Sequence, residues 1–195
     1  MSKKTERNTK GKIIKAAWDL FYEQGYDDTT VEEIIERSGT SKGSFYHYFE
    51  GKDALFESLS YIFDDEYIRL QENMPEGQNA FDKLLYLNEK LFSMIENRID
   101  IELLKRLYST QLVTKGEKHL LDSKRVYYKL LKKIVTEGQE KGELKEDMSV
   151  NEIVKLYAMC ERALLYDWCL CNGEYSLKQY AKKTMPMFLK EIKVY

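Results

Sequence analysis

Proline and glycine are scarce in this chain of 195 residues, which contains two and ten of them respectively. Turns between many short strands use these residues, so their scarcity argues against a β-rich fold. No apolar run approaches the ~20 residues that cross a bilayer, and the N-terminus does not lead into the apolar stretch of a signal peptide. The sequence therefore predicts an all-α protein that stays in the cytoplasm and does not bind a membrane.

Cysteine and histidine are also rare. Cys160, Cys169 and Cys171 are an odd number confined to one late segment, which fits a reducing compartment better than a disulfide framework. Cys169 and Cys171 point apart on a helix, so a metal site there is only a weak alternative to small apolar side chains. His47 and His119 lie far apart and no glycine-rich phosphate loop is present. We expect no metal, no cofactor and no enzymatic activity.

The net charge of −2 argues against a protein that coats nucleic acid by bulk electrostatics. The first sixteen residues are different, because they contain six basic residues and only one acidic residue, Glu6. Their local net charge is 6 − 1 = +5. A nucleic-acid contact would use this local patch, which consists of Lys3, Lys4, Arg7, Lys10, Lys12 and Lys15.

Apolar residues recur at spacings of three and four along most of the chain, which indicates amphipathic helices. Short helices come first and longer ones follow the break at Pro75 and Gly77. About nine helices are predicted, over residues 9–24, 31–37, 41–49, 52–73, 78–96, 99–112, 118–140, 149–172 and 176–192.

Two of the early helices are joined by a short turn. Thr30 and Glu33 have the spacing of a capping box, which begins the helix at 31. Gly39 permits a sharp turn, and Ser41 can cap the next helix. Two short helices joined by a turn that contains glycine are typical of a helix-turn-helix. Phe45 and Phe49 are expected in the core of this module, against Leu20, Phe21, Ile34 and Leu55.

The segment from residue 30 to 55 resembles, over its whole length, the N-terminal domain of the tetracycline-repressor (TetR) family. The resemblance rests on Gly25-Tyr26, Thr30, Gly39, Ser41-Lys42-Gly43, Tyr46-His47-Tyr48-Phe49 and Lys52. It implies a helix-turn-helix DNA-binding domain over 1–51 and a helical regulatory, ligand-binding and dimerisation domain over 52–195. The chain departs from the family tendency at Ser38 and Thr40, where small apolar residues are more usual, and this leaves the packing of the turn open.

The resemblance also implies which residues contact DNA. The first turn of a recognition helix lies on base edges in the major groove, and small or flexible donors suit that position. The residues of this kind are Thr40, Ser41, Lys42, Gly43 and Ser44. Contacts to the phosphates are expected from Thr30, Ser41, Tyr46, His47 and Lys52, with Tyr48 presenting a further hydroxyl at the end of the helix.

The same resemblance implies a regulator that binds a palindromic operator as a homodimer and is released by a small-molecule inducer, and repression is the expected outcome because it is the commoner one in the family. The resemblance also implies a cavity for an inducer, and the many aromatic side chains of this domain would suit an aromatic, cationic or lipid-like one. The residues expected to line it are Tyr67, Tyr86, Phe92, Tyr108, Tyr127, Tyr157 and Trp168. The last two helices would form the dimer interface, through Met159, Ala163, Tyr166, Leu170, Tyr180, Met187 and Phe188. For any one of these residues a place in the subunit core fits the spacing as well.

Two other functions remain as alternatives. A helical ligand-binding or scaffold protein without DNA binding would share the long helices, but it would have no use for the segment from Ser41 to Lys52 or for the basic N-terminus. The second alternative is an all-α enzyme, but this sequence shows no constellation of side chains that catalysis would need.

Overall fold

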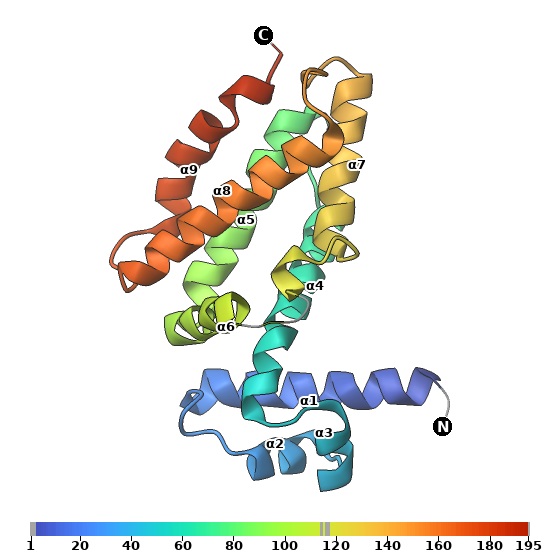
Figure 1. Ribbon diagram of the computed structural model, residues 1–195, viewed down its shortest axis with the longest axis vertical. Coiled ribbons are helices and arrows are strands. Elements are labelled where there is room, and N and C mark those ends of the chain that lie inside the picture. The colour runs from blue at the N-terminus through green and yellow to red at the C-terminus, as the bar shows by residue number, and fades with distance from the viewer. Residues whose placement is uncertain (1–2, 114, 116–117, 195) are drawn as a thin grey trace. The chain divides into compact units, whose positions relative to one another are not determined.

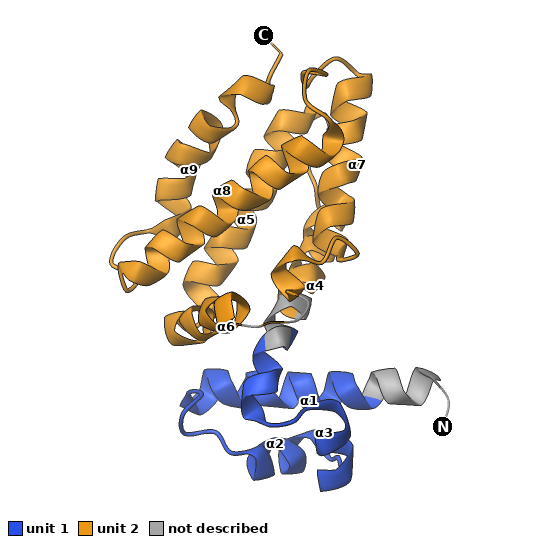
Figure 2. Cartoon of the chain, viewed as in Figure 1, with its two compact units in different colours: residues 1–59 blue, residues 60–195 orange. Residues whose placement is uncertain are grey.

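The computed structural model describes residues 3–113, 115 and 118–194 (Figure 1), and it describes only the backbone at 3–8, 57 and 59–61. The described residues form nine α-helices, three short 3-10 helices and no strand, which confirms the predicted all-α class. The chain divides into two compact units, residues 1–59 and residues 60–195 (Figure 2). None of the helices in the described part is both long and apolar enough to span a bilayer.

The first unit contains α1 (Lys3–Gln24), α2 (Val31–Ser38), α3 (Lys42–Tyr48) and a 3-10 helix at Lys52–Ser58. Phe45 and Phe49 are buried in its core, as predicted, and so are all four of their expected neighbours, Leu20, Phe21, Ile34 and Leu55. The indole Nε1 of Trp18 donates a hydrogen bond to Ser58 Oγ at 2.8 Å, which attaches the 3-10 helix to α1.

Helix α1 begins at Lys3, six residues before the predicted start at Thr9. The apolar periodicity used for the prediction starts only at Ile13, because the preceding turns of the helix have no apolar side chain to place in a core. Lysine and arginine are nevertheless good helix formers, so the helix extends backwards through them. The side chains of Lys3, Lys4 and Arg7, which belong to the predicted basic patch, lie outside the described residues.

The second unit contains α4 (Leu59–Glu72) from Ser60 onward, α5 (Ala80–Arg98), α6 (Ile101–Val113), α7 (Val126–Glu140), α8 (Val150–Leu170) and α9 (Leu177–Phe188). Helix α5 packs against α7 and α9, and α8 packs against α6, α7 and α9 (Figure 1). The core of the unit is built from the apolar faces of these helices, including Leu84, Leu87, Phe92, Leu131, Ile153, Tyr157 and Ala181.

Two predicted helices differ from the structure. The segment 118–140 is not one helix, because a 3-10 turn at His119–Leu121 is followed by a break before α7. The Asp122 carboxylate accepts a hydrogen bond from the backbone N–H of Lys124 at 2.8 Å, a local turn that competes with helix. The segment that begins at Lys52 likewise starts as a 3-10 helix and becomes α-helical only at Leu59.

Helices α5 and α7 approach each other very closely at Gly138. A Cβ atom at this position would lie 2.4 Å from the Cβ of Ala80 and 2.9 Å from Cδ1 of Leu144. The same region is joined by a hydrogen bond from the Ala80 backbone N–H to the Glu143 carboxylate at 2.7 Å. Because backbone and side chains of a packed core move little, only glycine fits this crossing.

Candidate DNA-binding surface and ligand cavity

Helix α2 begins with the predicted capping box. The Thr30 hydroxyl accepts a hydrogen bond from the Glu33 backbone N–H at 3.2 Å, and the Thr30 backbone N–H donates to the Glu33 carboxylate at 2.7 Å. These bonds from Thr30 lower the pKa of Glu33 below its ordinary value. The cap fixes the start of the helix that precedes the turn.

The turn between α2 and α3 depends on Gly39, whose φ of 62° lies in the left-handed region. Its flanking residues, Ser38 and Thr40, depart from the family tendency, and the structure shows how they are accommodated. The Ser38 hydroxyl donates to the Ile35 carbonyl oxygen at 3.0 Å and lies 2.8 Å from the Thr40 hydroxyl. The two polar side chains therefore satisfy each other within the turn.

Helix α3 has a buried apolar side and an exposed polar side. Ser41 caps it by accepting a hydrogen bond from the Ser44 backbone N–H at 3.1 Å. Phe45 is fully buried, whereas the side chains on the opposite face are exposed, and Ser44 and Tyr48 are half-buried. A short helix held by a buried phenylalanine and presenting a polar first turn has the form of a recognition helix. The exposed residues of α3 and its cap are Ser41, Lys42, Gly43, Tyr46 and His47.

Lys42 and Gly43 are accessible to a partner in different ways. The Lys42 ammonium lies 3.6 Å from a Glu32 carboxylate oxygen, and both side chains are about two-thirds exposed, so water screens this pair. A Cβ atom at Gly43 would meet only the Ser41 Oγ, at 4.0 Å. Nothing within the first unit therefore demands glycine at this position.

The Lys52 ammonium makes its contacts within the protein. It donates to the carbonyl oxygens of Tyr26 at 2.6 Å and of Thr29 at 2.7 Å, and it lies 4.1 Å from the centroid of the Tyr26 ring. The Tyr26 hydroxyl in turn donates to the Asp53 carboxylate. These contacts fix the loop before α2, so a phosphate could be contacted by Lys52 only in exchange for one of them.

The electrostatics of the first unit are uneven. Residues 1–59 carry nine basic and eleven acidic side chains, a net charge of 9 − 11 = −2, of which residues 17–59 contribute 3 − 10 = −7. The positive charge is therefore concentrated at the start of α1. The Lys10 ammonium lies 5.6 Å from the centroid of the Phe49 ring, at the end of α3. The basic part of α1 is thus close, at Lys10, to the C-terminal end of the candidate recognition helix.

The second unit contains a small cavity, partly open to solvent, with a volume of about 50 Å³, and α4, α5, α6, α7 and α8 surround it. Three of the seven predicted ligand residues line it, namely Tyr67, Tyr108 and Tyr127. The other lining residues were not predicted and are mostly apolar, namely Phe63, Leu91, Ile95, Leu107, Leu120, Arg125, Ala158, Glu161, Arg162 and Leu165.

The remaining predicted ligand residues lie elsewhere in the same unit. Phe92 and Tyr157 are fully buried core residues, and the Tyr157 hydroxyl donates to the Leu84 carbonyl at 3.0 Å. The Trp168 Nε1 donates to the Tyr175 carbonyl at 2.9 Å, which closes the turn after α8. The hydroxyl of half-buried Tyr86 donates to the Asn73 carbonyl at 3.3 Å.

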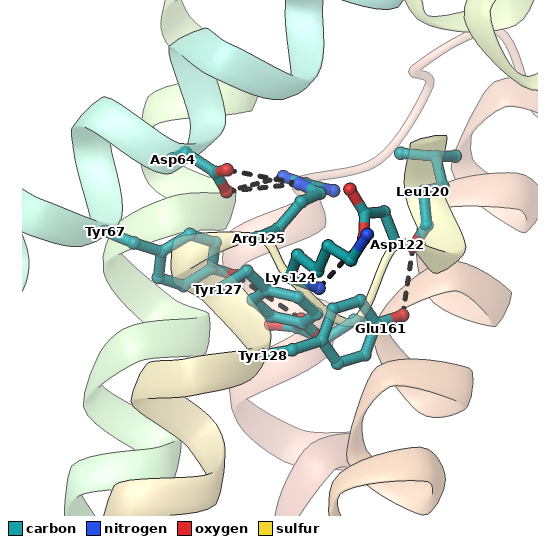
Figure 3. Close-up of polar contacts among 9 residues, drawn as sticks. All are labelled: Asp64, Tyr67, Leu120, Asp122, Lys124, Arg125, Tyr127, Tyr128 and Glu161. Atoms are coloured by element: carbon teal, nitrogen blue, oxygen red, sulfur yellow. Dashed lines mark hydrogen bonds and ion pairs between the residues drawn. The ribbon is translucent and has the colours of Figure 1, made fainter. Parts of the chain in front are cut away.

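The buried residue Glu161 is part of the cavity lining, and Figure 3 shows its carboxylate among the neighbouring tyrosines. It accepts hydrogen bonds from Tyr127 Oη at 2.7 Å, from Asn88 Nδ2 at 3.0 Å and from Tyr67 Oη at 3.4 Å. Burial raises the pKa of Glu161, and the hydrogen bonds act in the opposite direction. The charged residue at position 161 interrupts the apolar stripe of α8, and this interruption was the sequence signal for a polar site.

An ion pair lies beside this carboxylate in the same view (Figure 3). The Arg125 guanidinium donates to the Asp64 carboxylate through Nη2 at 2.8 Å and through Nε at 3.2 Å. Only 10% of the Arg125 side chain and 12% of the Asp64 side chain are exposed, so the pair is shielded from water. It connects α4 to the residue that precedes α7.

All seven residues predicted for the dimer interface are exposed on α8 and α9. On α8 they form one stripe at spacings of four, three and four. The exposed apolar side chains are Met159 at 50%, Tyr166 at 46%, Leu170 at 64%, Tyr180 at 47%, Met187 at 73% and Phe188 at 46%, and Ala163 lies in the same stripe. Since α8 and α9 pack side by side, these residues extend over two neighbouring helices. Apolar patches of this kind mark interaction surfaces.

Comparison with known families matches both units. Residues 13–59 match the family of bacterial regulatory proteins called the tetR family, and residues 65–191 match the C-terminal region of YsiA-like proteins. The fatty acid metabolism regulator protein of Bacillus subtilis is 24% identical over 181 residues, which cover 92% of this chain and 93% of that protein.

Solved structures share the fold. The transcriptional regulator FadR from Bacillus subtilis in complex with stearoyl-CoA is 24% identical, with a TM-score of 0.68 over 93% of this chain and 98% of that one. The TetR-family repressor FadR of Thermus thermophilus in complex with lauroyl-CoA is 21% identical, with a TM-score of 0.69 over 95% of each chain.

Proposed function

The chain belongs to the tetR family of bacterial regulatory proteins, dimeric DNA-binding transcription regulators that respond to small molecules, and we propose that it represses its target genes from a palindromic operator. The observation that carries the proposal is the exposed polar face of α3, which Phe45 holds in place from the buried side. Two copies of this face on one dimer would read two half-sites about one turn of DNA apart. The protein acts in the cytoplasm, where a bacterial chromosome lies.

The residues of this surface divide into two kinds of contact. Thr40, Ser41, Lys42, Gly43 and Ser44 form the first turn of α3 and the residues before it, which approach base edges. Thr30, Ser41, Tyr46, His47, Tyr48 and Lys52 are the residues that we propose to contact the phosphates and so set the register of the helix on the DNA. Lys52 acts mainly by holding the loop before α2, since its ammonium is bonded to two carbonyl oxygens of that loop.

We expect Lys42→Ala to weaken operator binding about 10-fold or more, and to relax the sequence preference at one position of each half-site. Tyr46→Phe removes a phosphate donor, so we expect weaker binding with an unchanged preference. Selection of bound fragments from genomic DNA, followed by fluorescence anisotropy with the selected operator, measures both effects. Lys190→Ala, an exposed lysine of the second unit, is the matched control. A Tyr46→Phe protein with altered base preference would contradict this division of contacts.

For the ligand we propose a fatty acyl thioester of coenzyme A. Two regulators that share the fold are described in complexes with such molecules. In this chain the cavity wall is rich in apolar side chains, which suits an acyl chain. Residues 105–133, which include Leu107, Leu120 and Arg125 of that wall, carry nine basic and two acidic side chains, a net charge of 9 − 2 = +7. A segment of this charge suits the phosphates of coenzyme A.

The cavity must enlarge to accept an acyl chain, because its volume of about 50 Å³ is far below the roughly 300–1,000 Å³ of pockets that hold small-molecule ligands. A ligand that binds the enlarged state alone shifts the protein toward that state. We therefore expect dodecanoyl-CoA to bind with micromolar or better affinity and to dissociate the operator complex. Titration of a labelled operator complex, with free coenzyme A as the control, measures this. Tight binding of dodecanoyl-CoA without any change in operator affinity would contradict the proposal.

A further inference from the structure

Arg125 belongs both to the cavity wall and to an ion pair with α4. Its side chain lines the cavity, and its guanidinium is hydrogen-bonded to the Asp64 carboxylate of α4 through two nitrogen atoms. The planar fork of a guanidinium matches one carboxylate or phosphate in a bidentate arrangement. An anionic group that entered the cavity would therefore compete with Asp64 for the same donors.

The charge of the cavity wall supports such a competition. Its charged lining residues are Arg125, Arg162 and Glu161, a net charge of 2 − 1 = +1. The Glu161 carboxylate accepts from the neutral donors Tyr67, Tyr127 and Asn88. Asp64 is not among the lining residues, yet its carboxylate pairs with Arg125 of the wall. If Asp64 withdrew, the wall would have room for one negative charge from a ligand.

The position of Asp64 connects this exchange to α4. Asp64 and Tyr67 are three residues apart on α4, so they lie on the same face of the helix. Their hydrogen bonds, to Arg125 and to Glu161, join α4 to the residue before α7 and to α8. Helix α4 follows directly on the last segment of the first unit, Lys52–Ser58. Loss of the bond to Asp64 would remove one of these two connections of the helix that is continuous in sequence with the DNA-binding unit.

We propose that a carboxylate or phosphate of the ligand replaces Asp64 on Arg125, and that this exchange is the step by which ligand binding is transmitted to α4. The inference rests on the proposed function, since it assumes that the cavity binds the ligand. In this proposal Asp64 competes with the ligand for the Arg125 guanidinium, whereas a purely structural Asp64 would not compete with it. Removal of its charge strengthens the binding of an anion and leaves the binding of an uncharged molecule unchanged.

The experiment compares three probes of equal chain length: dodecanoyl-CoA, dodecanoate and uncharged dodecanol, each below its micellar concentration. Calorimetry measures their Kd values with the wild-type dimer and with Asp64→Asn. We expect Asp64→Asn to tighten the binding of an anionic probe about 10-fold, the equivalent of one charge-assisted hydrogen bond, and to leave dodecanol unchanged. Tightening of dodecanoate identifies a carboxylate as the exchanging group, and tightening of dodecanoyl-CoA alone identifies a phosphate.

Glu66→Gln is the matched control. It makes the same change of charge two residues further along α4, and Glu66 pairs with Arg69 of the same helix rather than with Arg125. We expect no change for any probe. Arg125→Gln is the second variant, and it should abolish the preference for the anionic probes over dodecanol, whatever the stability of Asp64→Asn.

Equal changes of all three Kd values in Asp64→Asn, or an anion preference that survives Arg125→Gln, would overturn the exchange. If the probes bind the wild type and only this pattern fails, the proposed function stands and the exchange does not. If no probe binds the wild type at all, the ligand class is wrong and the exchange falls with it.

Discussion

Replacement of Lys10, Lys12 and Lys15 together by alanine is expected to weaken operator binding by roughly two to three orders of magnitude at about 0.1 M salt. Residues 17–59 carry a net charge of 3 − 10 = −7, so the attraction of the first unit for DNA comes from the start of α1. Each phosphate contact contributes a slope of about −0.9 to the dependence of log K on log salt. The three substitutions should therefore reduce that slope by up to about 3.

Fluorescence anisotropy at four or five salt concentrations measures both the affinity and the slope. The control is the triple variant Lys133→Ala, Lys141→Ala and Lys190→Ala, which makes the same change of net charge at exposed positions of the second unit. It should bind the operator as the wild type does. An unchanged salt slope in the α1 variant would show that these lysines do not approach the phosphates.

The second large effect is expected at the exposed stripe of α8 and α9. Leu170→Arg with Met187→Arg places two like charges where the subunits would meet, at positions that are 64% and 73% exposed in the single chain. In a two-fold interface each substitution faces its own copy or a neighbour of it, so the repulsion is doubled. We expect a monomer, with operator affinity reduced at least 100-fold because one half-site contact no longer supports the other. Analytical ultracentrifugation and anisotropy measure the two results.

Leu112→Arg is the matched control for this variant. Leu112 is 69% exposed and lies on α6, outside the stripe, so the same substitution there should leave a dimer with normal affinity. None of the substituted residues lines the cavity, and the monomeric variant should therefore still bind dodecanoyl-CoA. A Leu170→Arg, Met187→Arg protein that remained dimeric would place the interface elsewhere.

The first unit was predictable in detail because its signals are local. The capping box at Thr30, the left-handed turn at Gly39 and the cap at Ser41 each depend on residues within three or four positions of each other. The start of α1 was missed because its first residues include no apolar side chain and so carry no apolar periodicity. The break before α7 was missed although Asp122 signalled it, because the apolar positions on both sides continue in register.

The cavity was only partly predictable. Aromatic composition indicates that a pocket can exist, but it does not tell which aromatic side chains face it, and Trp168 closes a turn instead. The Asp64–Arg125 pair joins residues 61 positions apart in the sequence, and no local spacing reports such a contact. The exposure of the α8 stripe likewise separates an interface from a core only when the neighbouring helices are in place.

The close crossing of α5 and α7 at Gly138 has a practical consequence for anyone who wishes to evolve this regulator into a biosensor for another compound. Even a methyl group at 138 would collide with Ala80, so a random library loses every clone that changes this pair to something larger. A focused library would keep Ala80 and Gly138 and vary Phe63, Leu91 and Leu107 of the cavity wall. Its variants would then differ in ligand recognition while the fold that supports the cavity stays intact.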